Sequence, residues 1–210
     1  MGRVITLREG QELAAADLSA VATALKQAKP CAFPTDTVYG IGTNGQIKAG
    51  LRKIYEIKGR EALKPLPILI DSVEAARRWV EWTPAAEALA SRFWPGALTL
   101  VLKPTKEGRL LTFQEFPTLA VRVPAHPVAL ALLRASGVPL ATTSANMSGK
   151  PSLNTGAEVA AEFAARCESV VDGGAAGGKE STLVDASSLP IRVLREGALT
   201  RQQIMEAVPA

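Results

Sequence analysis

The chain has 210 residues, of which 47% are hydrophobic and 21% charged, a composition typical of a globular protein with one well-filled core. Its net charge of +4 is small and not concentrated in one run, so it favours a mixed, solvated surface over a dedicated nucleic-acid-binding patch. No apolar run approaches the roughly 20 residues of a membrane helix, and the early charges of the N-terminus exclude a signal peptide. We therefore expect a cytoplasmic protein that does not enter a membrane.

Helical and strand patterns alternate along the first half of the chain. Small polar residues at the predicted helix starts are typical N-caps. Pro65 and Pro67 lie at the beginning of the strand predicted at 65–70, where prolines are tolerated. The predicted elements are a helix from Asp17 to before Pro30, a strand at 31–33, a helix over 47–55, a strand at 65–70, a helix capped by Asp71 or Ser72 up to Val80, a helix over 85–93 and a strand at 97–102.

The second half continues the alternation and predicts one α/β domain over residues 1–210, with a mixed sheet covered by helices. No linker or repeat divides the chain, and the last three strands are so short that we do not expect all of them to be parallel. The predicted elements are a strand at 118–123, a helix over 127–136, a strand at 138–142, a helix over 156–166 with a Thr155–Glu158 capping box, the strands SVVD, STLVD and IRVLR, and a last helix capped by Thr200 and Gln203.

Residues 173–180, GGAAGGKE, reproduce the glycine and lysine spacing of a phosphate-binding loop. However, Glu180 stands where that motif needs Ser or Thr to hold magnesium, and the residues that follow predict a strand in place of the required helix. We interpret the segment as a glycine-rich loop, which beside a binding site would act as a lid.

Two polar segments follow predicted strands, where open α/β sheets place their ligands. In PTDTVYGIG (34–42), Thr35 and Thr37 offer hydroxyl and backbone N–H groups, although a plain turn with capping threonines is the favoured explanation of this segment taken alone. In ATTSANMSG (141–149), Thr142, Ser144 and Asn146 offer hydroxyl and amide groups without any charge. The second segment predicts contacts with a sugar, a base or an amino acid.

A basic loop contains Lys58, Arg60 and Lys64 between a predicted helix end and the next strand. Cations at a helix C-terminus favour the helix dipole, which is one explanation. A glycine-broken basic loop also suits a polyphosphate, for which Arg and Lys are the usual partners. The sequence leaves both explanations open.

Arg122 lies in the middle of TLAVRV, a strand otherwise built from apolar residues and threonine. A buried guanidinium needs an anion, because an unpaired buried charge is very costly. An internal carboxylate is possible, but no acidic residue occurs between Glu115 and Gly156. This favours a ligand anion as the partner of Arg122.

His126 is the only histidine, so a Ser-His-Asp triad is hard to build and a site with several histidine ligands cannot form. We expect no metal site made by protein side chains. Chemistry here should rely on positioning and electrostatics.

Taken together, the segments FPTDTVYGIG, KGR with KPLPILI, FWPGALTLVL, TLAVRVPAHP, PLATTSANMSG, STLVD and VLREG resemble the YrdC-like family over about residues 10–200. The pairing of K-x-R (Lys58, Arg60) with S-x-N (Ser144, Asn146) is the hallmark of that family. The resemblance implies a twisted mixed sheet with a basic concave cavity. It is closest to short members, which lack the second C-terminal domain of the longer ones.

The resemblance also implies residue roles. The threonine-binding set would be Thr35, Arg122, Thr142 and Ser181, and the ATP-binding set Arg60, Lys64, Thr118, Ser144, Asn146, Ser152 and Arg195. Lys58 and Arg60 would act electrostatically, without a covalent nucleophile. Glu61, where the family often has proline, and Lys64, where some members carry a neutral residue, depart from the pattern.

The reaction implied by the resemblance joins L-threonine, bicarbonate and ATP into L-threonylcarbamoyladenylate and pyrophosphate, with Mg²⁺ accompanying ATP and no organic cofactor. The product would pass to a tRNA threonylcarbamoyl-transfer enzyme complex, and weak RNA binding is compatible with this role. Two alternatives remain open: a carbamoyl-adenylate-forming module, as in hydrogenase-maturation carbamoyltransferases, and a double-stranded-RNA-binding module without catalysis.

Overall fold

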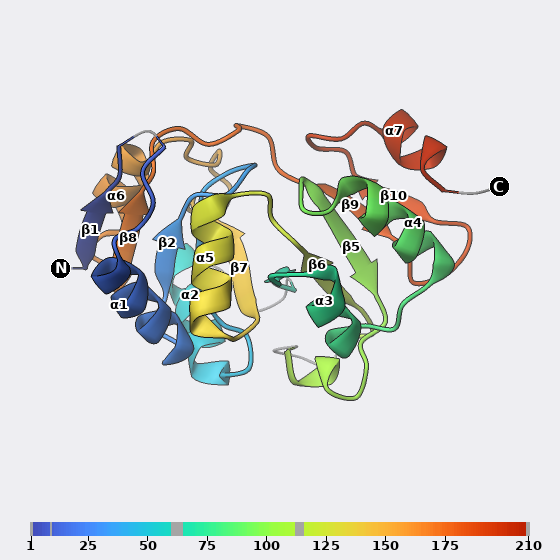
Figure 1. Cartoon of the computed structure of the whole chain (residues 1–210), viewed down its shortest axis with the longest axis horizontal. Coiled ribbons are helices and arrows are strands. Elements are labelled where there is room, and N and C mark those ends of the chain that lie inside the picture. The colour runs from blue at the N-terminus through green and yellow to red at the C-terminus, as the bar shows by residue number, and fades with distance from the viewer. Residues whose placement is uncertain (1, 9, 60–64, 112–115, 209–210) are drawn as a thin grey trace.

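The computed structural model describes residues 2–8, 10–59, 65–111 and 116–208. Within these ranges ten strands form one sheet, with helices packed against both faces (Figure 1). The strands are β1 (Arg3–Thr6), β2 (Cys31–Phe33), β3 (Gly40–Asn44), β4 (Ile68–Leu69), β5 (Leu98–Leu102), β6 (Leu119–Arg122), β7 (Leu140–Ser144), β8 (Ser169–Asp172), β9 (Thr182–Asp185) and β10 (Arg192–Arg195).

The strand order is β1-β8-β2-β3-β7-β4-β6-β5-β9-β10. The pairs β1–β8, β8–β2, β4–β6 and β5–β9 are parallel, and the other neighbours are antiparallel. The predicted α/β class with a mixed sheet is therefore confirmed. The expectation that the last three strands are not all parallel is also confirmed, because β9 and β10 run antiparallel.

The helices begin and end where local residue chemistry allows. They are α1 (Ala15–Lys26), α2 (Lys48–Lys58), α3 (Val73–Trp79), α4 (Pro84–Phe93), α5 (Pro127–Ser136), α6 (Gly156–Phe163) and α7 (Arg201–Glu206), with a 3-10 turn η1 (Gly108–Leu111). Both predicted capping boxes, at the starts of α6 and α7, are present. Helix α2 ends at Gly59, whose φ of 60° is the left-handed conformation that glycine adopts without strain. In the described part of the chain, no helix combines the length and the apolar character needed to span a bilayer.

The start of the first helix and the extent of the strand at 65–70 differ from the prediction, whereas the cap of α3 is one of the two residues predicted. Asp17 does not cap the first helix, which begins at Ala15; Asp17 lies in its first turn and pairs with Arg3, where a carboxylate also suits the helix dipole. Between Asp71 and Ser72, the cap of α3 is Ser72, whose Oγ accepts from the N–H of Ala75 at 3.1 Å. Residues 65–70 contribute only the short strand β4, and residues 65–67, with their two prolines, stay outside it.

Strand β3 was not predicted, because its glycines indicated a turn. The strand is fully buried, and a Cβ on Gly42 would lie 2.9 Å from the Phe33 ring and 3.1 Å from Cγ2 of Thr142. Close packing between neighbouring strands therefore requires glycine here, against its low strand propensity. Strand β7 also runs further than predicted, to Ser144, so Thr142 and Ser144 belong to the strand itself.

The core has two parts on opposite faces of the sheet. Helices α1 and α5 pack over β2 and β7 through residues such as Leu25 and Leu132, together with Phe33 and Leu140. On the other face, α2, α3, α4 and α6 share a larger cluster with β5, β6 and β8. The sheet face that α1 and α5 cover therefore extends further along the sheet, over β6, β5 and β9. This part of the face lies outside the core that the two helices form.

Candidate active site

Strand register gathers one set of side chains on this continuing face. Residues opposite each other in a sheet point to the same side, and successive residues alternate. The cross-strand pairs on this face are Gly42–Thr142, Gly40–Ser144, Leu69–Arg122, Thr99–Leu183 and Leu183–Arg195.

All of these residues except Gly42 line a cavity of about 450 Å³. Its described lining comes from strands and loops: Thr35, Thr37, Val38, Tyr39, Gly40, Pro65, Pro67, Leu69, Thr99, Arg122, Thr142, Thr143, Ser144, Glu180, Ser181, Leu183 and Arg195. All four residues of the expected threonine set are among them, together with Ser144 and Arg195 of the expected ATP set. The described lining contains two arginines, Arg122 and Arg195, and one carboxylate, that of Glu180.

Arg122 is 6% exposed, and all three of its guanidinium nitrogens donate hydrogen bonds. Nε donates to the Gly96 carbonyl at 2.9 Å, and one terminal nitrogen donates to Oγ1 of Thr37 at 2.8 Å. The other donates to Oδ1 of Asp36 at 2.6 Å in a buried ion pair. Burial lowers the pKa of Arg122 from its ordinary value, and the charge of Asp36 opposes this shift.

The inference that a ligand supplies the anion for Arg122 therefore needs correction. Asp36 is an internal carboxylate, 86 residues away along the chain and brought into contact by the fold. Counting acidic residues near Arg122 in the sequence could not find it. The only sequence signal is an Asp between the two threonines of the PTDT segment.

The PTDT segment is a tight polar turn in which Thr35 contacts its neighbours. Oγ1 of Thr35 donates to the Val38 carbonyl at 2.6 Å and accepts from the N–H of Thr37 at 3.2 Å. The hydroxyls of Thr35 and Thr37 are 3.0 Å apart. The two explanations of this segment thus hold together: the threonines stabilise a turn, and they also line the cavity.

A second group of hydrogen-bonded polar residues lines the same cavity. The hydroxyls of Ser181 and Thr99 are 2.7 Å apart, and Arg195 donates to the Ser181 carbonyl at 2.9 Å. Arg195 also forms an ion pair with Glu180, whose carboxylate accepts from Oγ of Ser152 at 3.4 Å. Thr99 and Glu180 are cavity residues that the sequence did not single out.

Lys58 lies behind the cavity wall and is 2% exposed. Its Nζ donates to the Ser144 carbonyl at 2.7 Å and to Oδ1 of Asn146 at 2.5 Å, and Oγ of Ser144 donates to the same Oδ1 at 2.7 Å. The K-x-R lysine and the S-x-N segment therefore form one hydrogen-bonded unit. Through it, Lys58 holds the end of β7 in place beside the cavity.

The remaining predicted site residues are not among the described residues of the cavity lining. Thr118 borders a small neighbouring hollow with Tyr55 and Leu66, and it is not among the described residues of the cavity lining. Pro65 lines both hollows. Arg60 and Lys64, with the Glu61 departure, lie outside the described residues. Their roles stay predictions.

The glycine-rich loop at 173–180 rests on the PTDT turn. The N–H of Gly178 donates to the Thr37 carbonyl at 2.8 Å. Tyr39 donates its hydroxyl hydrogen to the Gly174 carbonyl at 2.8 Å and accepts from the N–H of Gly173 at 3.0 Å. Strand β9 follows the loop, so the interpretation that this segment is not a helix-capped phosphate loop is confirmed.

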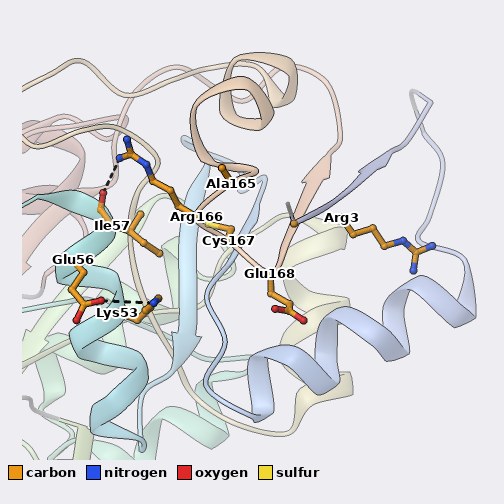
Figure 2. A pocket seen from close by; sticks show the side chains of 9 residues that line it. Arg3, Lys53, Glu56, Ile57, Ala165, Arg166, Cys167 and Glu168 are labelled. Atoms are coloured by element: carbon orange, nitrogen blue, oxygen red, sulfur yellow. Dashed lines mark hydrogen bonds and ion pairs between the residues drawn. The ribbon is translucent and has the colours of Figure 1, made fainter.

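A larger hollow, of about 740 Å³, lies between α2 and the turn from α6 to β8 (Figure 2). It is wide and shallow, and its charged residues already have partners within the described chain. The pairs are Arg3–Asp17, Lys53–Glu56, Arg166–Glu162 and Glu168–Lys29. The smaller cavity is the better candidate site, because several of its polar groups are buried and hydrogen-bonded in a defined geometry.

Comparison with known proteins finds relatives of this chain. A family model named for Sua5, YciO and YrdC, and described as telomere recombination, matches residues 23–197. The threonylcarbamoyl-AMP synthase of Bacillus subtilis is 43% identical over 91% of this chain, and the chain spans 56% of its length. The threonylcarbamoyl-AMP synthase of Xanthomonas axonopodis is 35% identical, and the match covers 88% of this chain and 97% of the Xanthomonas protein.

A solved structure of Pyrococcus abyssi Sua5 complexed with L-threonine superposes with a TM-score of 0.91 at 39% identity. The superposition covers 98% of this chain and 60% of the Pyrococcus chain. This chain thus spans little more than half the length of the Bacillus and Pyrococcus relatives. By the family match and by these relatives, the chain belongs to the Sua5/YciO/YrdC family.

Proposed function

We propose that this protein joins L-threonine, bicarbonate and ATP into L-threonylcarbamoyladenylate and pyrophosphate, a nucleotidyl transfer that leads to threonylcarbamoyladenosine in tRNA. One observation carries the proposal: Thr35, Arg122, Thr142 and Ser181, the residues expected to bind threonine, line a single cavity. The names of the relatives, and the threonine complex of the Pyrococcus protein, support the same substrate.

The threonine end of the cavity suits an amino acid. Arg122 offers a planar guanidinium, which pairs with a carboxylate through two parallel hydrogen bonds. Thr35, Thr142 and Ser181 line the same cavity, and their hydroxyls are suited to the polar groups of the substrate. A buried site of this kind discriminates well, because a substrate lacking one group leaves a protein hydrogen-bonding group unpaired.

The nucleotide end would use Arg195, Ser144 and Ser152, with Arg60 and Lys64 on the phosphates. The threonine amine and bicarbonate first give N-carboxythreonine and water. An oxygen of the new carboxylate then attacks the α-phosphorus of ATP, and the bond from this phosphorus to the pyrophosphate oxygen breaks. The protein aligns the two reactants and neutralises the charge that develops, with Lys58 and Arg60 as the expected electrostatic contributors.

Magnesium is expected to arrive with ATP. In the described part of the chain, no group of three or more acidic, histidine or cysteine side chains converges, and Glu180 is the carboxylate of the described lining. This donor set fits an ion held mainly by the phosphates and not a resident metal. When bound, Mg²⁺ would neutralise part of the charge of the phosphates.

The test is nucleotide turnover with each substrate omitted in turn. We expect pyrophosphate and an AMP-containing product only when threonine, bicarbonate and ATP are all present. Release of ADP and phosphate would contradict the adenylation. Turnover that needs carbamoyl phosphate in place of threonine would support a carbamoyl-adenylate reaction, and RNA binding without any turnover would support a binding module.

A further inference from the structure

Asp36 stands behind Arg122 and does not line the cavity. Its Oδ1 accepts one hydrogen bond from Arg122 at 2.6 Å and another from the N–H of Ala125 at 3.0 Å. The same carboxylate oxygen therefore joins the PTDT turn to the segment that follows β6. The side chains of Arg122 and Asp36 are 7% and 17% exposed, so water screens this contact only weakly.

The bonds of Arg122 fix the plane of its guanidinium. A guanidinium has five N–H donors, and three are used by Gly96, Thr37 and Asp36. Among the described residues, two N–H donors, one on each terminal nitrogen, have no protein acceptor. The three hydrogen bonds already made fix the direction of these two donors. Of the three acceptors, only Asp36 is charged.

We propose that Asp36 is a positioning residue for threonine: it orients the Arg122 guanidinium so that its remaining N–H donors meet the substrate carboxylate. This inference rests on the proposed function. Asp36 is 86 residues from Arg122 in the chain and touches Arg122 directly, whereas its contact with substrate would be indirect. An orienting partner behind a ligand-binding group typically affects affinity about 10- to 100-fold when it is removed.

The experiment measures threonine and ATP affinity by calorimetry for the wild type and Asp36→Asn. The amide keeps the size of the side chain but removes its charge. We expect threonine affinity to fall about 10- to 100-fold, while ATP affinity changes less than about twofold. In an Arg122→Lys background, Asp36→Asn should cause little further loss, because the guanidinium that it orients is already absent.

Asp185→Asn is the matched control. Asp185 is also buried and also pairs with an arginine at 2.6 Å, but its partner Arg192 lies outside the cavity lining. This variant should lose stability and keep threonine affinity. If Asp36→Asn does not fold, Asp36→Glu provides the test, because it keeps the charge and moves the carboxylate by one methylene. A positioning role predicts weaker threonine binding in this variant. A role in charge balance alone predicts unchanged threonine affinity.

The outcomes separate the two proposals. A wild-type protein that fails to bind threonine overturns the proposed function. A wild type that binds threonine, with an Asp36 variant that binds it equally well, overturns the positioning role alone.

Discussion

The two arginines of the cavity each have a carboxylate partner, and the two pairs differ in exposure. Arg122 and Asp36 are buried, so their pairing holds one geometry. Arg195 and Glu180 are 47% and 38% exposed, and an ion pair of that kind contributes only about 0–1 kcal/mol. We therefore expect Arg195 to exchange Glu180 for a phosphate at low cost, and Arg122 to keep Asp36 when a ligand binds.

Replacing Arg122 by lysine should abolish most threonine binding. Arg122→Lys keeps the positive charge beside Asp36 but removes the planar pair of donors. Breaking such a buried pair typically costs about 2–5 kcal/mol, which corresponds to roughly 30- to 5000-fold in affinity. Titration of threonine and of ATP into the variant checks this, with thermal unfolding as the control for folding. Normal threonine affinity in a folded variant would make Arg122 a purely structural residue.

Replacing Glu180 by glutamine should strengthen ATP binding. Glu180→Gln removes the carboxylate that competes with phosphate for Arg195, and the gain should be up to about fivefold, because the pair itself is weak. Glu107→Gln is the control, since Glu107 pairs with Arg78 on the surface away from the cavity. ATP binding that weakens in Glu180→Gln would show instead that this carboxylate helps to hold the nucleotide.

The site was only partly predictable at this scale. A charged residue within an apolar strand pattern identified Arg122, and small polar residues after strands identified Thr35 and Thr142. Asp36 was missed as the partner of Arg122 because their contact depends on tertiary structure. Thr99 was missed because a threonine inside a strand has ordinary β propensity and gives no signal.

Among the elements, the loop at 173–180 has the most direct effect on the site. It packs on the PTDT turn through backbone hydrogen bonds and through the Tyr39 hydroxyl. Burial raises the pKa of Tyr39 to about 12, so this hydroxyl stays protonated and donates at physiological pH. The loop therefore supports the turn that carries Asp36 and Thr37.

Gly177→Ala should disturb that support. A Cβ at this position would lie 2.6 Å from the Asp36 carbonyl and 3.3 Å from the Thr37 carbonyl, so the loop or the turn must move. We expect a loss of about 1–3 kcal/mol in stability and weaker threonine binding. Gly137→Ala is the control: its φ of 64° makes it strained, but open space surrounds its Cβ and it lies at the end of α5. Unchanged threonine affinity in Gly177→Ala would show that the loop does not affect threonine binding.

Helices were predicted better than strands, for a local reason. The capping boxes of α6 and α7, and the proline at the start of α5, act within a few residues, so the sequence displays them. Strand β3 depends on how closely Gly42 approaches Phe33 and Thr142 across the sheet. Strand β1 depends on its pairing with β8, more than 160 residues later, which the sequence does not display.

At the scale of the whole molecule, sheet order explains how distant segments make one site. The order β3-β7-β4-β6-β5-β9-β10 places residues from Gly40 to Arg195 on one continuous face. Helices α1 and α5 form their core with the strands at one end of this face. The cavity is therefore a consequence of topology: in the described part of the chain, the other half of the face carries polar residues instead of a second helical layer.

The account predicts one product that contains parts of all three substrates. The most direct measurement is mass spectrometry of the nucleotide product formed from ATP with ¹³C-bicarbonate and isotopically labelled threonine. We expect one AMP adduct that carries the label of bicarbonate and the label of threonine together, with one pyrophosphate released for each adduct. An adenylate that carries the threonine label without the bicarbonate carbon, or no adenylate at all, would contradict the account.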